Sequence, residues 1–182
     1  RNQNKIQNKY VIEIGAGTGT TGLASLLLGS TLVVLTDLSY TLDNLRSNQQ
    51  QAQNLLIQSS SSLLTTTTTS ITTSNELDSQ ENSNIPQSYV LPLDWSDPST
   101  YIFPNHIKST YPKQWDVILG ADIVWLDHLI PALIMALKSL ATENTIVYLS
   151  HQTRSHHTDD LFFTQLKKYF DVKLIPKDEL NP

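Results

Sequence analysis

Short apolar runs alternate with longer segments of helical periodicity along most of the chain. The runs are rich in Val, Ile and Leu, as is typical of strands covered on both faces. They predict strands at 10–14, 31–36, 88–93, 115–119 and 145–149, with a sixth beginning at 172–175. Helical spacing of apolar residues predicts helices at 20–28, 38–57, 126–140 and 159–169. This alternation predicts an α/β fold with a mostly parallel sheet flanked by helices.

Two stretches depart from this alternation. The polar residues 1–9 predict an exposed lead-in. Residues 58–87 are dominated by Ser, Thr, Asn and Gln, with homopolymeric runs at 59–62 and 65–69. Such a tract buries too little apolar surface to offset the entropy of ordering it. We therefore expect one domain over residues 1–182, interrupted by a disordered insertion at about 58–87.

The two ends of the chain also bear on its extent. The sequence begins at Arg1, without methionine, and opens almost directly on a core strand. It ends at Pro182 soon after a strand-like segment. We expect a fragment whose sheet is incomplete at both ends.

Composition argues against several kinds of site and partner. The 182 residues carry 17 acidic and 12 basic side chains, a net charge of −5, whereas nucleic-acid binders normally show a basic face. There is no Cys, so neither a disulfide nor a thiolate metal site can form. The His and Asp residues between 151 and 160 match no standard ligand spacing, so we expect no metal site. No apolar run is long enough to span a bilayer.

The most distinctive stretch is residues 10–22, YVIEIGAGTGTTG, where a strand runs into a glycine-rich turn and a helix start. Gly15, Gly17 and Gly19 allow positive φ and the close approach of a ligand. Thr18 or Thr20 is expected to cap the helix. Free N–H groups at such a helix start favour a nucleotide-type ligand.

The same turn fits the G-x-G-x-x-G pattern of dinucleotide sites at residues 17–22, and Asp37 follows at the end of the next strand. A carboxylate at that place accepts hydrogen bonds from a ribose diol, in NAD and in S-adenosylmethionine alike. The alternative role for Asp37 is a helix cap.

Three features favour S-adenosylmethionine. Glu13, inside the first strand, would repel a pyrophosphate but suits a sulfonium ligand, either as a counter-charge or as an organiser of the turn; the alternative is a structural hydrogen-bond partner. Asp94 and Trp95 follow the third strand, where an acid can accept from the adenine amino group and an indole can stack on the ring. The alternative for Trp95 is a core position. Ala121 is small enough to line a cleft, and Asp122 stands at its mouth unless it caps the next helix.

These motifs, in this order, carry a resemblance. EIGAGTG at 13–19, Asp37, DW at 94–95 and WDVILGADIVW at 115–125 resemble the seven-β-strand S-adenosylmethionine-dependent methyltransferases. Within them, the chain is similar to the protein-lysine methyltransferase branch, methyltransferase family 16. The resemblance covers nearly the whole chain apart from the insertion.

The resemblance implies a Rossmann-like seven-strand fold, S-adenosylmethionine as cofactor, and a protein substrate that presents a lysine, of the chaperone or elongation-factor type. It also implies a cytoplasmic location. Asp122 would orient the lysine amine and Trp125 would contact the methylated ammonium. The cofactor-binding residues would be Glu13, Gly15, Ala16, Gly17, Asp37, Asp94, Trp95 and Ala121.

Two other functions remain open from the sequence. An NAD-dependent oxidoreductase would use the same glycine turn and Asp37, but it leaves Asp94 and Trp95 unexplained. A catalytically silent binding module is suggested by the incomplete ends and by Trp125, because the family usually has Tyr or Phe at that position.

Overall fold

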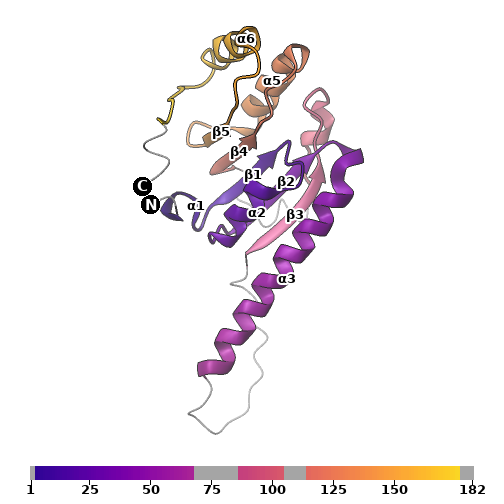
Figure 1. Cartoon of the computed structure of the whole chain (residues 1–182), viewed down its shortest axis with the longest axis vertical. Coiled ribbons are helices and arrows are strands. Elements are labelled where there is room, and N and C mark those ends of the chain that lie inside the picture. The colour runs from indigo at the N-terminus through magenta and orange to yellow at the C-terminus, as the bar shows by residue number, and fades with distance from the viewer. Residues whose placement is uncertain (1–2, 68–85, 105–113, 177–182) are drawn as a thin grey trace.

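The structure, a computed structural model, describes residues 3–67, 86–104 and 114–176. Five parallel strands form one sheet in the order β3-β2-β1-β4-β5 (Figure 1). They are β1 (Tyr10–Ile14), β2 (Leu32–Asp37), β3 (Gln87–Pro92), β4 (Val117–Ala121) and β5 (Ile146–Ser150). Each begins and ends within two residues of its predicted place, which confirms the α/β prediction. The order reverses between β1 and β4, the kind of position where such sheets bind ligands.

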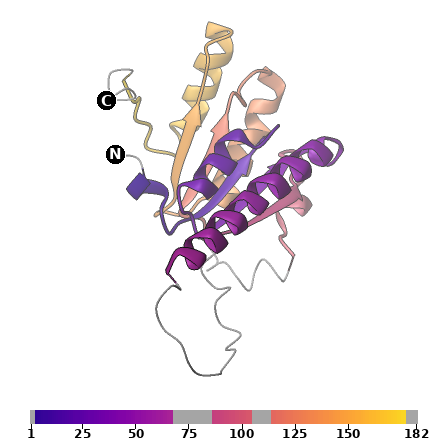
Figure 2. The ribbon, with the colours of Figure 1, turned by 60° about the horizontal axis from the view of Figure 1, so that its bottom comes forward.

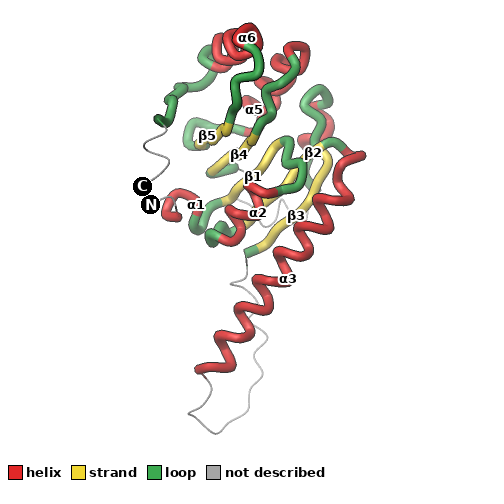
Figure 3. Tube along the Cα trace, viewed as in Figure 1, coloured by secondary structure: helices red, strands yellow, loops and turns green. Residues whose placement is uncertain are grey.

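Helices cover both faces of the sheet. One face packs against α2 (Thr20–Leu27) and α3 (Leu42–Thr67), and the other packs against α5 (Ile130–Leu140) and α6 (His156–Leu166). Alternate residues of β1 serve the two cores: Val11 faces the α2 and α3 side, and Ile12 faces the α5 and α6 side. Figure 3 shows the two helix groups on either side of the strands. Double coverage explains why the central strands β1 and β4 are apolar at almost every position.

The chain before β1 is only in part the exposed lead-in predicted from its polarity: Lys5, Gln7 and Asn8 are exposed, but Ile6 is not. Residues Gln3–Ile6 form the short helix α1, and Ile6 is buried in the core beneath α2. The other short helices of the described residues have 3₁₀ geometry: η1 (Ser39–Thr41), η3 (Pro98–Tyr101) and η4 (Asp127–Leu129).

Helix α3 corrects the predicted start of the insertion. Its described part runs from Leu42 to Thr67, so residues 58–67 are helical rather than disordered. Once a helix has nucleated, Gln and Ser extend it at little cost per residue. The end of α3 extends past β3 (Figure 2). The rest of the expected insertion, 68–85, lies outside the described residues. Within the described ranges no helix, α3 included, is both long and apolar enough to cross a bilayer.

The sixth strand predicted at 172–175 is not formed. Residues 171–176 have no regular secondary structure, and Leu174 is 84% exposed. A strand needs a neighbour to satisfy its backbone groups, and within the described residues β5 pairs only with β4. The apolar pattern alone could not reveal whether a partner was available.

Candidate active site

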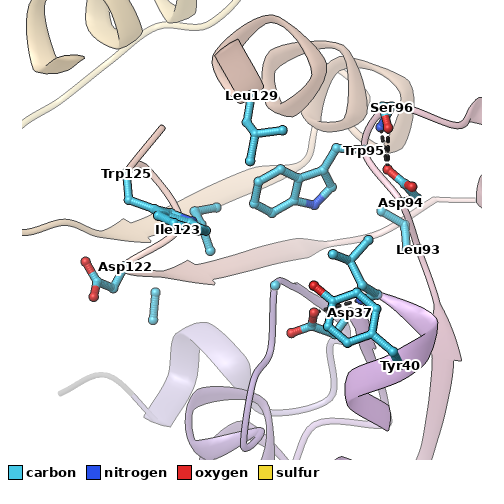
Figure 4. Close-up of a pocket in the computed structure, with 13 residues that line it drawn as sticks. Asp37, Tyr40, Leu93, Asp94, Trp95, Ser96, Asp122, Ile123, Trp125 and Leu129 are labelled. Carbon is cyan, nitrogen blue, oxygen red and sulfur yellow. Dashed lines mark hydrogen bonds between the residues drawn. The ribbon is translucent and has the colours of Figure 1, made fainter. Parts of the chain in front are cut away.

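The carboxyl ends of the first four strands surround a cleft of about 240 Å³. Seven of the residues predicted from sequence line it: Gly15, Asp37, Asp94, Trp95, Ala121, Asp122 and Trp125. They come from segments spread over more than one hundred residues of sequence, and the parallel sheet gathers them at one edge. In Figure 4, Asp122 and Trp125 lie on one side of the cleft, and Asp37 and Asp94 lie on the other. Glu13, Ala16 and Gly17 are not among the lining residues.

The glycine turn brings β1 close to the loop that follows β4. Gly15 has φ +61°, and a Cβ placed there would lie 2.8 Å from Ile123 Cγ2 and 3.2 Å from Trp95 Cζ2. Glycine is therefore required both for the backbone conformation and for the space. The N–H of Gly17 donates to Asp37 Oδ2 over 2.7 Å, which ties the turn to the end of β2.

Neither Thr18 nor Thr20 caps α2, contrary to prediction. The N-cap is Gly19, with φ +81° and no side-chain cap. The two threonine hydroxyls instead lie 3.1 Å apart, in hydrogen-bonding contact with each other. A Cβ on Gly19 would come 2.6 Å from Leu45 Cδ1, so the helix start packs too closely against α3 for a larger capping residue.

Glu13 lies beneath the turn. It is 2% exposed, and its Oε2 accepts a 2.9 Å hydrogen bond from the N–H of Gly22 in the first turn of α2. Burial raises the pKa of Glu13 to about 7, although this hydrogen bond acts in the opposite direction. The structural partner considered from sequence is therefore present, and Glu13 joins β1 to α2.

The Asp37 side of the cleft holds two carboxylates and an indole in fixed positions. Asp37 Oδ1 accepts from the N–H of Leu38 over 2.7 Å. Asp94 Oδ1 accepts from both the N–H and the hydroxyl of Ser96, and these bonds lower the pKa of Asp94. Trp95 is held at its carbonyl by the Tyr101 hydroxyl over 2.6 Å. A carboxylate oxygen can accept more than one hydrogen bond, so both acids retain capacity for a ligand.

Asp122 and Trp125 form the other side of the cleft. Asp122 has φ +56°, which is unusual for a residue with a side chain, and its N–H donates to Ser150 O over 2.8 Å. Its carboxylate forms an ion pair with the guanidinium of Arg154, which holds the pKa of Asp122 below its ordinary value. Asp122 does not cap the next helix, the alternative considered from sequence, because the N-cap of η4 is Leu126. Trp125 is 57% exposed.

Comparison with known proteins identifies the family. The family model described as lysine methyltransferase matches residues 1–63 and 62–169. The chain belongs to this lysine methyltransferase family. Its resemblance to that branch, stated from the sequence motifs, is thereby confirmed.

Curated relatives of this family member include two lysine methyltransferases. The chain is 30% identical over 179 residues to protein N-lysine methyltransferase METTL21A of Danio rerio. The aligned region covers 95% of this chain and 62% of that relative. It is 27% identical over 177 residues to EEF1A lysine methyltransferase 3 of Mus musculus, covering 95% and 58%. The chain thus spans about three fifths of the length of these relatives. Among solved structures, it is similar to Arabidopsis thaliana protein arginine methyltransferase 10, with a TM-score of 0.46 and 15% identity over 80% of this chain and 31% of that one.

Sequence reasoning missed several residues of this site, among them Tyr40, Ile123 and Arg154. Tyr40, in η1, and Ile123, after β4, line the cleft. Arg154 reaches Asp122 across 32 positions of sequence, and no spacing rule signals that pair. His151 and Asp159 share a 2.7 Å hydrogen bond, but over the described ranges no three His, Asp or Glu side chains gather in a group that could hold a metal.

Proposed function

We propose that this protein is an S-adenosylmethionine-dependent methyltransferase that modifies a lysine side chain of a protein substrate. The observation that carries the proposal is the cleft itself, in which Asp37, Asp94 and Trp95 share one hollow with Asp122 and Trp125. Membership of the lysine methyltransferase family supports the same reaction.

The residues of the cleft fit an adenosine-containing cofactor. Asp37 would accept hydrogen bonds from the ribose hydroxyls, Asp94 would accept from the adenine amino group, and the face of Trp95 would lie against the ring. Gly15 and Ala121 leave room beside these groups. Glu13, Ala16 and Gly17 would act through the turn that they build. The cofactor supplies an activated methyl group, so the protein's main contribution is to hold both reactants in position.

At the other side of the cleft, Asp122 would accept a hydrogen bond from the incoming lysine amine. Trp125 would contact the methylated ammonium through a cation–π attraction worth about 0.5–2 kcal/mol. One group of relatives bears the name EEF1A lysine methyltransferase, which supports a protein acceptor of the elongation-factor type. A chaperone acceptor and a cytoplasmic location, both implied by the resemblance, belong to the same proposal.

Calorimetry tests the cofactor part of this proposal. S-adenosylhomocysteine should bind and NADH should not. Asp37→Asn keeps an oxygen for the Gly17 N–H but removes the charge, so we expect affinity for S-adenosylhomocysteine to fall about tenfold. The matched control is Asp43→Asn, at an exposed aspartate of α3 that pairs with Arg46 and lies outside the cleft lining; its affinity should equal that of wild type. Binding of NADH alone would restore the oxidoreductase alternative.

Labelling tests the acceptor part. The full-length protein is incubated with methyl-labelled S-adenosylmethionine and a cell lysate, with purified EEF1A as a defined acceptor. Mass spectrometry of the labelled protein should locate the methyl group on a lysine side chain. Cofactor binding without any labelled protein would instead favour the catalytically silent binding module.

A further inference from the structure

The carboxylate that faces the proposed acceptor already has a cationic partner. Arg154 and Asp122 are both about half exposed, with 54% and 49% of their side chains accessible. Besides the ion pair itself, Arg154 Nε lies 3.3 Å from Asp122 Oδ1, so the guanidinium contacts both carboxylate oxygens. A second hollow, lined by Asp122, Trp125 and Arg154, opens at this place. Any amine that approaches Asp122 through this hollow meets the guanidinium as well.

The loop that carries Arg154 is fastened to the first turn of α6. Asp159 accepts from the Thr153 hydroxyl over 2.7 Å and shares a hydrogen bond of the same length with His151 Nε2. On the other side of Arg154, Ser155 caps α6 by accepting from the N–H of Thr158. Bonds on both sides of Arg154 thus restrain its backbone. The guanidinium itself is held by its contacts with Asp122.

We propose that Arg154 is a positioning residue for the methyl acceptor: it fixes the orientation of the Asp122 carboxylate and offsets its charge, so that lysine is held there in its neutral form. This inference rests on the proposed function. An unpaired carboxylate would stabilise the lysine ammonium and oppose loss of its proton. A guanidinium on the same carboxylate reverses much of that effect, because it repels the ammonium while leaving carboxylate lone pairs to accept from the neutral amine.

The proton balance explains why this matters. The acceptor must first lose one proton to water. Its nitrogen lone pair then forms the new bond to carbon, and the electron pair of the broken carbon–sulfur bond stays with the leaving sulfur. Among the described residues, the ionisable groups that act on Asp122 are Arg154 and His151, with Asp159 bonded to His151. Asp37 and Asp94 line the same cleft. In this set only Arg154 carries a permanent positive charge.

The test is the pH dependence of kcat at saturating acceptor, which reports ionisations in the enzyme–acceptor complex, for Arg154→Ala, Arg154→Lys and Arg154→Gln in the full-length protein. The acceptor is the protein that wild type labels in the lysate. Arg154→Ala should move the acidic limb of the profile to higher pH by about 0.5–1 unit. The rate of methyl transfer near neutral pH should fall roughly threefold to tenfold, and its difference from wild type should narrow as the pH rises. Arg154→Gln should behave like Arg154→Ala. Arg154→Lys should keep the acidic limb close to its wild-type position, because lysine retains the positive charge. The match should be incomplete, because lysine lacks the planar guanidinium that contacts both carboxylate oxygens.

Three controls make the outcome decisive. Arg46→Ala removes an arginine of equal exposure that also pairs with an aspartate, and its profile should match wild type. Affinity for S-adenosylhomocysteine should be unchanged in the Arg154 variants, since Arg154 does not line the cleft beside Asp37 and Trp95. The unfolding midpoint should be unchanged as well, because the ion pair is exposed. The ¹³C titration of the Asp122 carboxyl, which needs neither cofactor nor acceptor, should move to higher pH in Arg154→Ala.

An unshifted limb, or a variant faster than wild type near neutral pH, would overturn the inference; the latter would show that Arg154 obstructs the acceptor. Either result leaves the proposed function standing, because the wild-type enzyme is still active. If wild type labels no lysine at all, the proposed function itself fails, and the inference falls with it.

Discussion

Two acidic side chains at the same end of the sheet have opposite surroundings. Glu13 is buried beneath the glycine turn, bonded to the N–H of Gly22, and its pKa is raised to about 7. Asp122 is half exposed at the cleft, paired with Arg154, and its pKa is lowered. The first is costly to ionise and joins β1 to α2, whereas the second stays ionised and accessible. The comparison separates an acid that supports the fold from an acid available for chemistry, although both lie in motifs of the same resemblance.

The largest expected effect tests the buried side of this comparison. In Gly22→Ala, the new Cβ would overlap Leu35 Cδ2 and lie 2.6 Å from Glu13 Oε2. Overpacking together with loss of the hydrogen bond to a buried acid should lower the free energy of unfolding by about 4 kcal/mol, measured by urea denaturation. Gly17→Ala is the control, because no atom lies within 4 Å of the added Cβ; its positive φ should cost only about 1–2 kcal/mol. Equal losses in the two variants would show that Glu13 and Gly22 are not tightly packed.

The next effect concerns the ionisation of Glu13. Between pH 4.5 and about 7 the unfolded chain has lost the Glu13 proton while the folded chain keeps it, so rising pH favours the unfolded state. Glu13→Gln keeps an oxygen for the Gly22 N–H but cannot ionise. Across this window, wild type should lose up to about 3 kcal/mol of stability relative to the variant.

Urea denaturation at several pH values measures this difference. Glu143→Gln, at an exposed glutamate, is the matched control and should follow wild type at every pH. A wild-type stability that stays parallel to Glu13→Gln through the window would mean that burial does not perturb Glu13, and the contrast with Asp122 would disappear.

Much of the fold could be predicted because its signals are local. Strand β1 and the end of β2 follow from apolar runs that stop at Gly15 and Asp37. The errors arose where structure depends on distant partners or on the length of an element. Helix α3 extends into a polar tract, and Ile6 is buried in the core. The segment 172–175 has no strand beside it in the described part of the chain. The composition of a segment indicates how much apolar surface it can bury. It does not indicate which other segment will pack against it.

The candidate site divides in the same way. Asp37 and the Asp94–Trp95 pair could be placed at one edge from strand order alone, because parallel strands end together. The partners of these residues could not. The sequence leaves Glu13 either at the ligand or as a structural hydrogen-bond partner, and it could not name Gly22 as that partner. Arg154 has no role predicted from sequence, although it pairs with Asp122. A hydrogen bond depends on side-chain direction and on loops, and neither is encoded in spacing.

The smallest effect on stability is expected at the exposed acid. Asp122→Asn suits the left-handed backbone there, since Asn adopts positive φ readily. Exposed ion pairs contribute little to folding, so the unfolding midpoint of the variant should equal that of wild type at neutral pH. Methyl transfer should nevertheless fall, because the neutral amide orients the amine less well. The lowered pKa of Asp122 fixes the sign of any residual difference: it should be present above the ordinary aspartate pKa, vanish as the pH falls, and weaken with added salt.

Thermal unfolding and the methyl-transfer rate, measured on the same preparations, decide this point. If Asp122→Asn and Glu13→Gln change stability by equal amounts relative to wild type, the ion pair of Asp122 with Arg154 supports the fold. Both acids would then have a structural role. If stability and methyl transfer are both unchanged, Asp122 neither supports the fold nor orients the acceptor, and the acceptor must lie elsewhere in the cleft. Unchanged stability with a reduced rate of methyl transfer is the one result that supports the comparison. It would show that the Asp122 carboxylate contributes to methyl transfer and not to folding, whereas Glu13 contributes to folding.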